Sequence, residues 1–472
     1  MKKWVLTLSL AFIIGAWQML PPAPTRPNII FLLADDMRFD ALGVAGNRHI
    51  QTPHLDQLAK QGYYFRNAFV TTSICCISRA SILSGQYARR HGIEDFDTPF
   101  THAAFEQTYP ALLHSAGYFT GFIGKYGVGH HERLLPKQQF DFWEGYAGHG
   151  VYFMKQPNDT RPIHNTDWVS QKMEEFLSQA PQNNPFCLSV SFKAPHSEDG
   201  RKENGGFLPQ PEFDTLYKST KLPIPPTNQD KFYNQFPEEW KTDTRGKTNE
   251  GRVRYAGRFD SLHFQNTVKA YYRLVTGIDQ AVGRLVAYLQ RINQLQNTVI
   301  LFTSDNGFYL GEHGLSDKWY GHNESIRVPL IIYDGRTPQS HKRLEPMVLN
   351  IDIAPTILQY AHVPIPSRMQ GKPLQLLINT SNTKWRKEFF YEHRYDPGTY
   401  PVYIPMTEGI VSEKYKYMRY FWSKTDTTTL YEELFAYRKD SLETCNLVNE
   451  SSCKVLLEEM LKKNQKIKTL IK

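Results

Sequence analysis

The chain has 472 residues, of which 40% are hydrophobic and 13% aromatic, and its formal net charge is +8. This composition is sufficient for a large buried core and excludes a disordered chain. The basic surplus is spread along the sequence without a lysine- or arginine-rich arm. We therefore expect a mild attraction for anionic partners and no nucleic-acid partner.

The first 24 residues resemble an export signal in their layout. Lys2 and Lys3 precede a hydrophobic run from Trp4 to Trp17, and a proline-rich stretch follows. The run is short for a membrane span, which favours a secretory signal. No clean small-residue cleavage site follows the run, so an uncleaved N-terminal membrane tether is a second interpretation. Both interpretations predict an exported protein that is periplasmic, secreted or membrane-tethered.

Hydrophobic runs rich in β-branched residues alternate with helical patterns over most of the chain. The helical patterns cover residues 54–62, 109–118 and 266–292. The hydrophobic runs, each interpreted as a buried strand, cover residues 28–36, 119–124, 185–192, 297–306 and 328–333. Strands that are hydrophobic throughout and alternate with helices are typical of a parallel sheet covered on both faces. We therefore predict an α/β fold with a large mixed, mostly parallel sheet sandwiched by helices.

Two regions depart from this pattern. Residues 197–262 are polar and rich in Pro, Gly, Lys and Asn, which predicts a lid or pocket wall. Residues 376–472 contain alternating aromatics at 415–422 and a helical pattern at 455–463. This part of the chain predicts a small C-terminal antiparallel sheet closed by a helix, next to a main domain over residues 25–375.

Acidic and amide side chains stand at the ends of two predicted strands. Asp35 and Asp36 end the run at 28–36, and Asp305 and Asn306 end the run at 297–306. Ligands of parallel sheets bind beyond the carboxyl ends of the strands, so we expect these side chains to meet. Three carboxylates and an amide oxygen form the hard-oxygen ligand set that Ca²⁺ prefers. Taken alone, each pair also fits a helix cap or a turn.

The segment at 71–92 places Cys75 three residues before a Ser78-Arg79 pair. A guanidinium group close to a thiol lowers the pKa of that thiol and offers a fork for an oxyanion. The alternative interpretation is a buried pair, Cys75 and Cys76, beside a helix that carries an arginine.

Three cationic candidates come from the remaining strand ends. Lys125 follows the run at 119–124, His196 follows the run at 185–192, and Lys318 lies between the last two runs. Each alone fits a solvated loop or a turn. A divalent cation, an arginine, two lysines and a histidine together would suit a tetrahedral oxyanion such as sulfate or phosphate.

From Pro27 to about Leu447 the chain resembles the sulfatase family, within the alkaline phosphatase superfamily. The signature Cys-x-Pro-Ser-Arg followed by x-x-x-Leu-Thr-Gly reads here CCISR at 75–79 and ASILSG at 80–85. The other shared segments are PNIIFLLADD (27–36), GFIGK (121–125), KAPH (193–196), FTSDNG (302–307), DKW (317–319) and LYEELFAYRKDSLETCNL (430–447).

The resemblance implies an alkaline phosphatase-like fold with residues 25–375 as the catalytic domain. It also implies that a maturation enzyme converts Cys75 to formylglycine, whose hydrated aldehyde is the nucleophile. One Ca²⁺ would be held by Asp35, Asp36, Asp305 and Asn306, with the modified Cys75 as a further ligand.

The remaining roles concern the substrate. Arg79 would stabilise the nucleophile as an alkoxide, Lys125 and Lys318 would neutralise the sulfuryl oxygens, and His196 with Lys318 would help the alcohol to leave. The resemblance thus implies a sulfuric ester hydrolase, and export, the positive charge and the polar lid favour a sulfated carbohydrate as its substrate.

The chain departs from the family pattern at two positions. Ile77 replaces the usual proline of the maturation motif, and Gly127 stands where many relatives have a histidine, for which His130 or His131 are candidate replacements. Cys76 is the wrong distance from Arg79 to be the modified residue. Two alternatives remain: a phosphonate or phosphodiester hydrolase of the same superfamily, and an unmatured relative that binds sulfated glycans without cleaving them.

Overall fold

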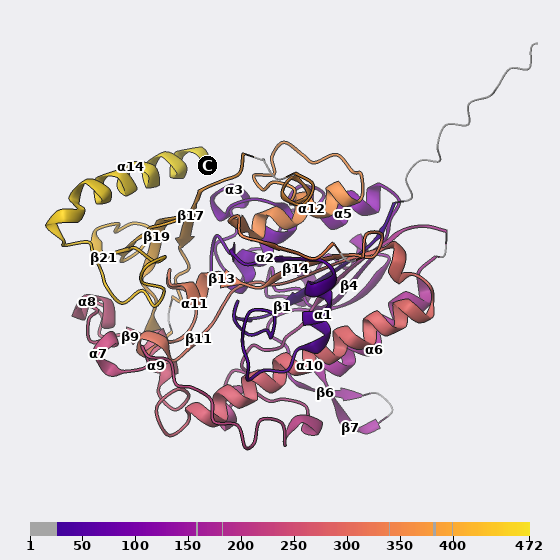
Figure 1. Ribbon diagram of the computed structural model, residues 1–472, viewed down its shortest axis with the longest axis horizontal. Helices are drawn as coiled ribbons and strands as arrows, with labels where there is room; N and C mark the ends of the chain where they lie inside the picture. Colours follow the sequence, from indigo (N-terminus) through magenta and orange to yellow (C-terminus); the bar gives the residue numbers. More distant parts are fainter. Residues whose placement is uncertain (1–25, 157–158, 182, 339, 381–383, 399) are drawn as a thin grey trace, which may run out of the picture.

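The computed structural model describes residues 26–156, 159–181, 183–338, 340–380, 384–398 and 400–472. The predicted export signal at 1–24 lies outside these residues. Within the described part of the chain, no helix combines the length and the apolar character that crossing a bilayer requires. Figure 1 shows a central sheet with helices on both faces and a smaller C-terminal unit at one end.

The central sheet has eight strands in the order β15-β2-β14-β10-β1-β8-β4-β5. The five strands from β10 to β5 are parallel, whereas β14 runs antiparallel to β10, and β2 runs antiparallel to β14. The bounds are β1 (Asn28–Ala34), β2 (Tyr63–Phe65), β4 (Phe119–Lys125), β5 (Phe142–Tyr146), β8 (Phe186–Ser191), β10 (Thr298–Ser304), β14 (Leu330–Asp334) and β15 (Lys342–Leu344). The predicted mixed, mostly parallel sheet is confirmed.

The run at 328–333 does not continue the parallel order that the apolar pattern indicated. It divides between β13 (Arg327–Val328), in a separate small sheet, and the antiparallel strand β14. An apolar run indicates that both faces of a strand are buried. Since a buried strand can run in either direction, the pattern does not distinguish a parallel strand from an antiparallel one.

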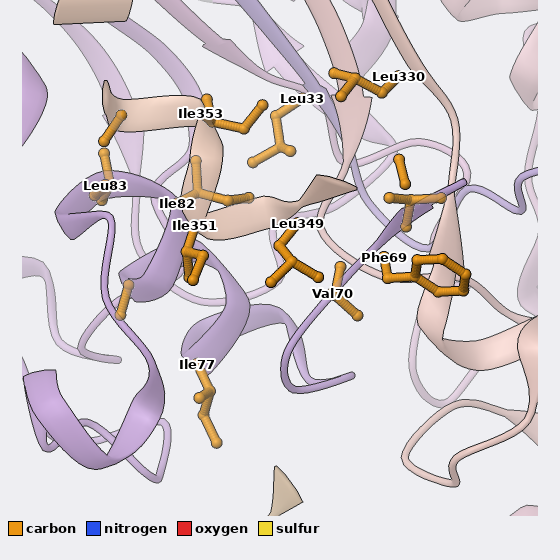
Figure 2. Packing of buried hydrophobic residues seen from close by; sticks show 14 of the residues in the cluster. Leu33, Phe69, Val70, Ile77, Ile82, Leu83, Leu330, Leu349, Ile351 and Ile353 are labelled. Atoms are coloured by element: carbon orange, nitrogen blue, oxygen red, sulfur yellow. The ribbon is translucent and has the colours of Figure 1, made fainter. Parts of the chain in front are cut away.

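Two hydrophobic cores lie on the two faces of the sheet. Alternate residues of β1 enter different cores, because successive side chains of a strand point to opposite faces. One face is covered by α1 (Pro53–Gln61), α6 (Asn165–Gln179) and α10 (Phe264–Arg291). The other is covered by α2 (Cys75–Ser84), α5 (Tyr109–Ser115) and α12 (Ile353–Tyr360). Figure 2 shows Leu33 of β1 near Ile353 of α12 in this second core.

The long helix α10 matches the helical pattern predicted at 266–292, and it carries a buried carboxylate. Asp279 accepts hydrogen bonds from the backbone N–H groups of His54 (3.3 Å) and Leu55 (2.8 Å) at the start of α1. Thr52, which precedes α1, makes no side-chain cap. Asp279 therefore supplies the N-terminal cap of α1 from a neighbouring helix.

The C-terminal unit is an antiparallel sheet of β17 (Glu388–His393), β19 (Met406–Ser412), β20 (Lys416–Phe421) and β21 (Thr429–Phe435). The helix α14 (Lys454–Leu470) packs against this sheet, and Figure 1 shows it in yellow. The predicted small sheet with a closing helix is confirmed, although the helix is longer than the pattern at 455–463.

The polar segment 197–262 contains short elements rather than one long loop. These are two short 3-10 helices, η3 (Glu203–Gly206) and η4 (Pro211–Phe213), followed by α7 (Asp230–Tyr233), α8 (Glu238–Lys241), β9 (Thr248–Asn249) and α9 (Glu250–Tyr255). Trp240 is fully buried and stacks on Phe236 with a ring-centroid distance of 3.9 Å. A few isolated aromatic side chains thus anchor a segment whose average composition is polar.

Candidate active site

The acidic side chains meet at the carboxyl ends of the parallel strands β1 and β10. The register pairs Ala34 with Ser304, so Asp35 and Asp305 leave the sheet side by side. The backbone N–H of Asp36 donates to Oδ1 of Asp305 at 3.1 Å. Asp36 has a φ of 67°, a left-handed conformation that aspartate tolerates better than most residues.

The donor atoms at this point fit a hard divalent cation. Ligand atoms of Asp35, Cys75 and Asp305 lie within 4.8 Å of one another, and so do ligand atoms of Asp35, Asp36 and His196. Oδ1 of Asp35 and Oδ1 of Asn306 are buried without a hydrogen-bond partner. Buried oxygens are normally satisfied, so two orphaned ones beside a carboxylate cluster indicate a place for an ion.

The electrostatics of the carboxylates agree with this interpretation. Burial and the neighbouring Asp35 raise the pKa of Asp36 to about 7 and that of Asp305 to about 6. Burial is the largest single effect on Asp35 and acts against its ionisation, but Lys125, Arg79 and the other nearby cationic groups together outweigh it and hold the pKa of Asp35 well below its usual range. Two of the three carboxylates therefore lack sufficient positive charge, which a divalent cation would supply.

Cys75 is the first residue of α2, and only 1% of it is exposed. Burial raises the pKa of its thiol, and Lys125 and Lys318 offset only part of this effect. The sequence-based expectation of a lowered thiol pKa is therefore wrong. The Arg79 guanidinium attracts the ionised thiol, but burial and the charge of Asp35 outweigh the cations around it.

The Arg79 side chain is buried and held by several acceptors. Its Nε donates to Oδ2 of Asp305 at 2.8 Å, and its Nη1 donates to the carbonyl oxygen of Lys125 at 2.7 Å and to the hydroxyl of Ser191. Gly127 packs directly against this arginine with a φ of 74°, and a Cβ there would lie 2.7 Å from Cδ of Arg79. A side chain at position 127 would therefore displace Arg79.

The three predicted cationic groups contact the acidic pair that follows β1. Nζ of Lys125 contacts Asp35, while Nζ of Lys318 lies 2.5 and 2.7 Å from the two carboxylate oxygens of Asp36. Nε2 of His196 is 3.6 Å from Oδ2 of Asp36. Burial, followed by Lys318, lowers the pKa of His196 well below its usual range, so the imidazole is neutral.

The loop around Lys318 holds an unusual backbone conformation. Asp317 and Trp319, on either side of the lysine, have φ values of 73° and 82°. Such values are rare for bulky residues and persist where the surroundings fix them. Arg254 of α9 contributes, because its Nη1 lies 3.0 Å from Oδ2 of Asp317.

The structure brings all the predicted site residues into one buried cluster. Its members are Asp35, Asp36, Cys75, Arg79, Lys125, His196, Asp305, Asn306 and Lys318.

Sequence reasoning missed His149, in the loop after β5. Its Nδ1 lies 3.2 Å from Nζ of Lys125, and its ring stacks on His196 with a centroid distance of 5.1 Å. His130, a predicted candidate, is exposed and meets the His149 ring edge-on at 5.7 Å. His131, the other candidate, is also exposed. His149 stands in a glycine-flanked loop shortly after the end of β5, and β5 has no continuous apolar run that would predict a buried strand, so no sequence signal marks this position.

The fold and the site together define an enzyme of the alkaline phosphatase superfamily, with a mostly parallel sheet and a charged cluster at its strand ends. The sulfatase family model matches residues 27–363, and the model described as "N-sulphoglucosamine sulphohydrolase, C-terminal" matches residues 311–470. The chain belongs to the sulfatase family.

Three known proteins illustrate the relationship. An N-acetylglucosamine-6-O-sulfatase of Bacteroides thetaiotaomicron is 29% identical over 86% of this chain and 80% of its own length. A second protein, solved in complex with its substrate D-glucosamine-2-N,6-O-disulfate, superposes with a TM-score of 0.78. It is 26% identical in sequence, over 95% of this chain and 98% of that one. The phosphonate monoester hydrolase of Agrobacterium radiobacter shares the fold, with a TM-score of 0.77 and 19% identity over 95% and 96% of the two chains.

Proposed function

We propose that this sulfatase removes sulfate from a sulfated carbohydrate, with a formylglycine made from Cys75 as nucleophile and one Ca²⁺ at the site. The observation that carries the proposal is the buried cluster in which orphaned acidic and amide oxygens and three cationic side chains surround residue 75. Asp35, Asp36, Asp305 and Asn306 would hold the ion.

The state of Cys75 supports the modification. As a thiol it stays protonated in this environment, because burial raises its pKa, and a protonated thiol is a poor nucleophile. A hydrated aldehyde offers two hydroxyl groups, one to attack the sulfur and one to release the sulfate afterwards. Bound Ca²⁺ would supply positive charge that favours the ionised hydroxyl.

The chain's own residues would bind and orient the ester. Arg79, which donates to Asp305, would stabilise the nucleophile as an alkoxide. Lys125 and Lys318 would bind the sulfuryl oxygens, because ammonium groups stabilise charge that develops on a transferring group. His196, together with Lys318, would stabilise or protonate the oxygen of the departing alcohol.

Similarity and charge suggest the class of substrate. The related N-acetylglucosamine-6-O-sulfatase and the structure bound to a disulfated glucosamine support a sulfated amino sugar. The net charge of +8 favours a polyanionic glycan. The segment 197–262, whose Arg254 reaches Asp317 next to Lys318, would form a wall of the binding site.

The test is a comparison of hydrolysis rates on 4-nitrophenyl sulfate, a 4-nitrophenyl phosphodiester and a set of defined sulfated saccharides, with and without a chelator. We expect sulfate esters to react faster and the chelator to abolish the reaction. A preference for the phosphodiester by orders of magnitude would support the second candidate, a phosphonate or phosphodiester hydrolase, which the shared fold motivates.

Mass spectrometry of the peptide that contains Cys75 tests maturation. Conversion of the thiol to the aldehyde removes about 18 Da. An unmodified thiol in protein from the native host would favour a glycan-binding relative without activity, an alternative motivated by Ile77.

Export and domain division belong to the same proposal. Residues 1–24 would direct export, as a cleaved signal or as a membrane tether, and a formylglycine-generating enzyme would act on the chain beforehand. Residues 25–375 would form the catalytic domain and residues 376–472 a subdomain.

A further inference from the structure

His149 stands at the rim of the buried cluster, beside groups that the proposed function assigns to the substrate. Lys125 and His196 are buried, whereas His149 is partly exposed. Its imidazole contacts both of them, through Nδ1 with Lys125 and through its ring face with His196. His149 therefore places a partly exposed imidazole directly against both buried groups.

The contact with Lys125 determines which nitrogen of His149 carries the hydrogen. An ammonium group has three donors and no acceptor, so Nδ1 accepts a hydrogen bond from Nζ of Lys125. A neutral imidazole has one donor and one acceptor nitrogen, which leaves the hydrogen on Nε2. Among the described residues, none forms a hydrogen bond with this Nε2–H group.

The surroundings keep His149 neutral and fixed. Lys125 and burial lower the pKa of His149 to about 2. Nζ of Lys193 donates to the His149 carbonyl oxygen at 3.1 Å, which fastens the backbone of the loop. The Phe96 ring packs edge-on against the imidazole at 5.7 Å. The unpaired donor is therefore pre-positioned, and such donors bind anions without a cost of ordering.

We propose that His149 is a substrate-binding residue whose Nε2–H group donates a hydrogen bond to an oxygen of the bound sulfate ester. This inference rests on the proposed function, because it requires a sulfate ester next to Lys125 and His196. It adds a neutral donor to the cationic groups, and it assigns this donor to a loop outside the shared segments quoted above.

The experiment measures binding without turnover. The parent protein carries Cys75→Ser, is loaded with Ca²⁺ and keeps His149. Calorimetry measures the Kd of 4-nitrophenyl sulfate for this parent and for three variants that each add one substitution. His149→Phe keeps a ring that stacks on His196 but has no donor, and we expect its Kd to rise by about 10- to 100-fold, the effect of losing a hydrogen bond to a charged group. His149→Gln keeps an N–H group near the position of Nε2 and should bind within a few-fold of the parent. His102→Phe, at an exposed histidine outside the site, should bind like the parent.

Each outcome decides one point. A Kd for His149→Phe equal to that of the parent would overturn the inference, and equal losses in His149→Phe and His149→Gln would assign His149 a packing role instead. A parent that binds Ca²⁺ but no sulfate ester would overturn the proposed function itself. Thermal unfolding of each variant identifies any loss that comes from misfolding.

Discussion

Three carboxylates and three cationic side chains share the buried site, so its charges nearly cancel before an ion binds. The carboxylates belong to Asp35, Asp36 and Asp305, and the cations to Arg79, Lys125 and Lys318. A divalent ion would leave a net charge of about +2 in a medium of low dielectric constant. Such a site attracts a singly charged sulfate ester. We therefore expect the three cationic side chains to act in substrate binding as well as in stabilising the fold.

Lys318 offers a direct test at the residue scale. The variant Lys318→Met should lower kcat/KM on 4-nitrophenyl sulfate by about 10² to 10³, because it removes a charge that stabilises the reacting group. The affinity for Ca²⁺ should not fall, since Asp36 loses a competing cation. Lys462→Met, on the exposed side of α14, is the matched control and should leave kcat/KM unchanged. If Lys318→Met lowers kcat/KM by less than about three-fold, Lys318 does not stabilise the reacting group.

The site residues differ in how well the sequence could predict them. Asp35, Asp36, Asp305 and Asn306 were predictable because parallel strands end at one edge of a sheet. His149 was not, since its position depends on how a loop folds back over Lys125. The raised pKa of Cys75 was also missed, because burial of the whole cluster depends on the packing around it.

At the scale of elements, α2 joins the reactive residue to the core. Every residue of this helix is buried. Figure 2 shows its side chains Ile82 and Leu83 near those of neighbouring elements, and Ile77 is a buried member of the same core. Ile77, the departure from the maturation motif, thus has a packing role in the folded protein.

The apolar pattern of the sequence predicted where the central strands end and where α10 lies. It did not predict the direction of β14 or the short helices at 197–262, because these depend on tertiary contacts.

The burial of α2 predicts the order of maturation and folding. Since Cys75 is 1% exposed, an enzyme could reach it only before the chain folds. Folded protein with an unmodified Cys75 should remain unmodified when incubated with an active formylglycine-generating enzyme, whereas a peptide covering residues 70–92 should be converted. Mass spectrometry would detect the loss of about 18 Da in each sample. Conversion of the folded protein at the rate of the peptide would contradict this order.

A buried carboxylate is one of the links between the C-terminal sheet, α14 and the rest of the chain. Glu408 of β19 lies 3.4 Å from Arg89 next to α2, 2.9 Å from Arg419 and 2.7 Å from Lys468 of α14. Glu408→Gln should lower the free energy of unfolding by about 3 kcal/mol, because it leaves partly buried cations without their shared partner. Chemical denaturation measures this change, and Glu458→Gln, at an exposed position of α14, should have no effect. An equal stability of the two variants would show that the link is not stabilising.

At the scale of the whole molecule, stability and the site are coupled through protons. In calcium-free protein the pKa of Asp36 is about 7 and that of Asp305 is about 6, above the value of about 4 in an unfolded chain. Between pH about 4 and 7 the folded state therefore binds more protons than the unfolded state, and these two groups make stability fall as pH rises. Glu324 and Glu392, whose pKa values burial raises to about 7, add the same slope whether or not calcium is bound.

Calcium should reverse the contribution of the two aspartates. Its ligands must be ionised, so the stabilisation by calcium should grow from pH 5 to pH 8 and then level off. At a calcium concentration of about 100 times Kd, the stabilisation should reach about 2.7 kcal/mol. The measurement is the difference in Tm with and without calcium at each pH, in which the contributions of Glu324 and Glu392 cancel. Asp305→Asn, which lacks one ligand carboxylate, should show little calcium effect at any pH. If calcium raises Tm by the same amount at pH 5 and pH 8, it does not bind to these carboxylates and must bind at another site.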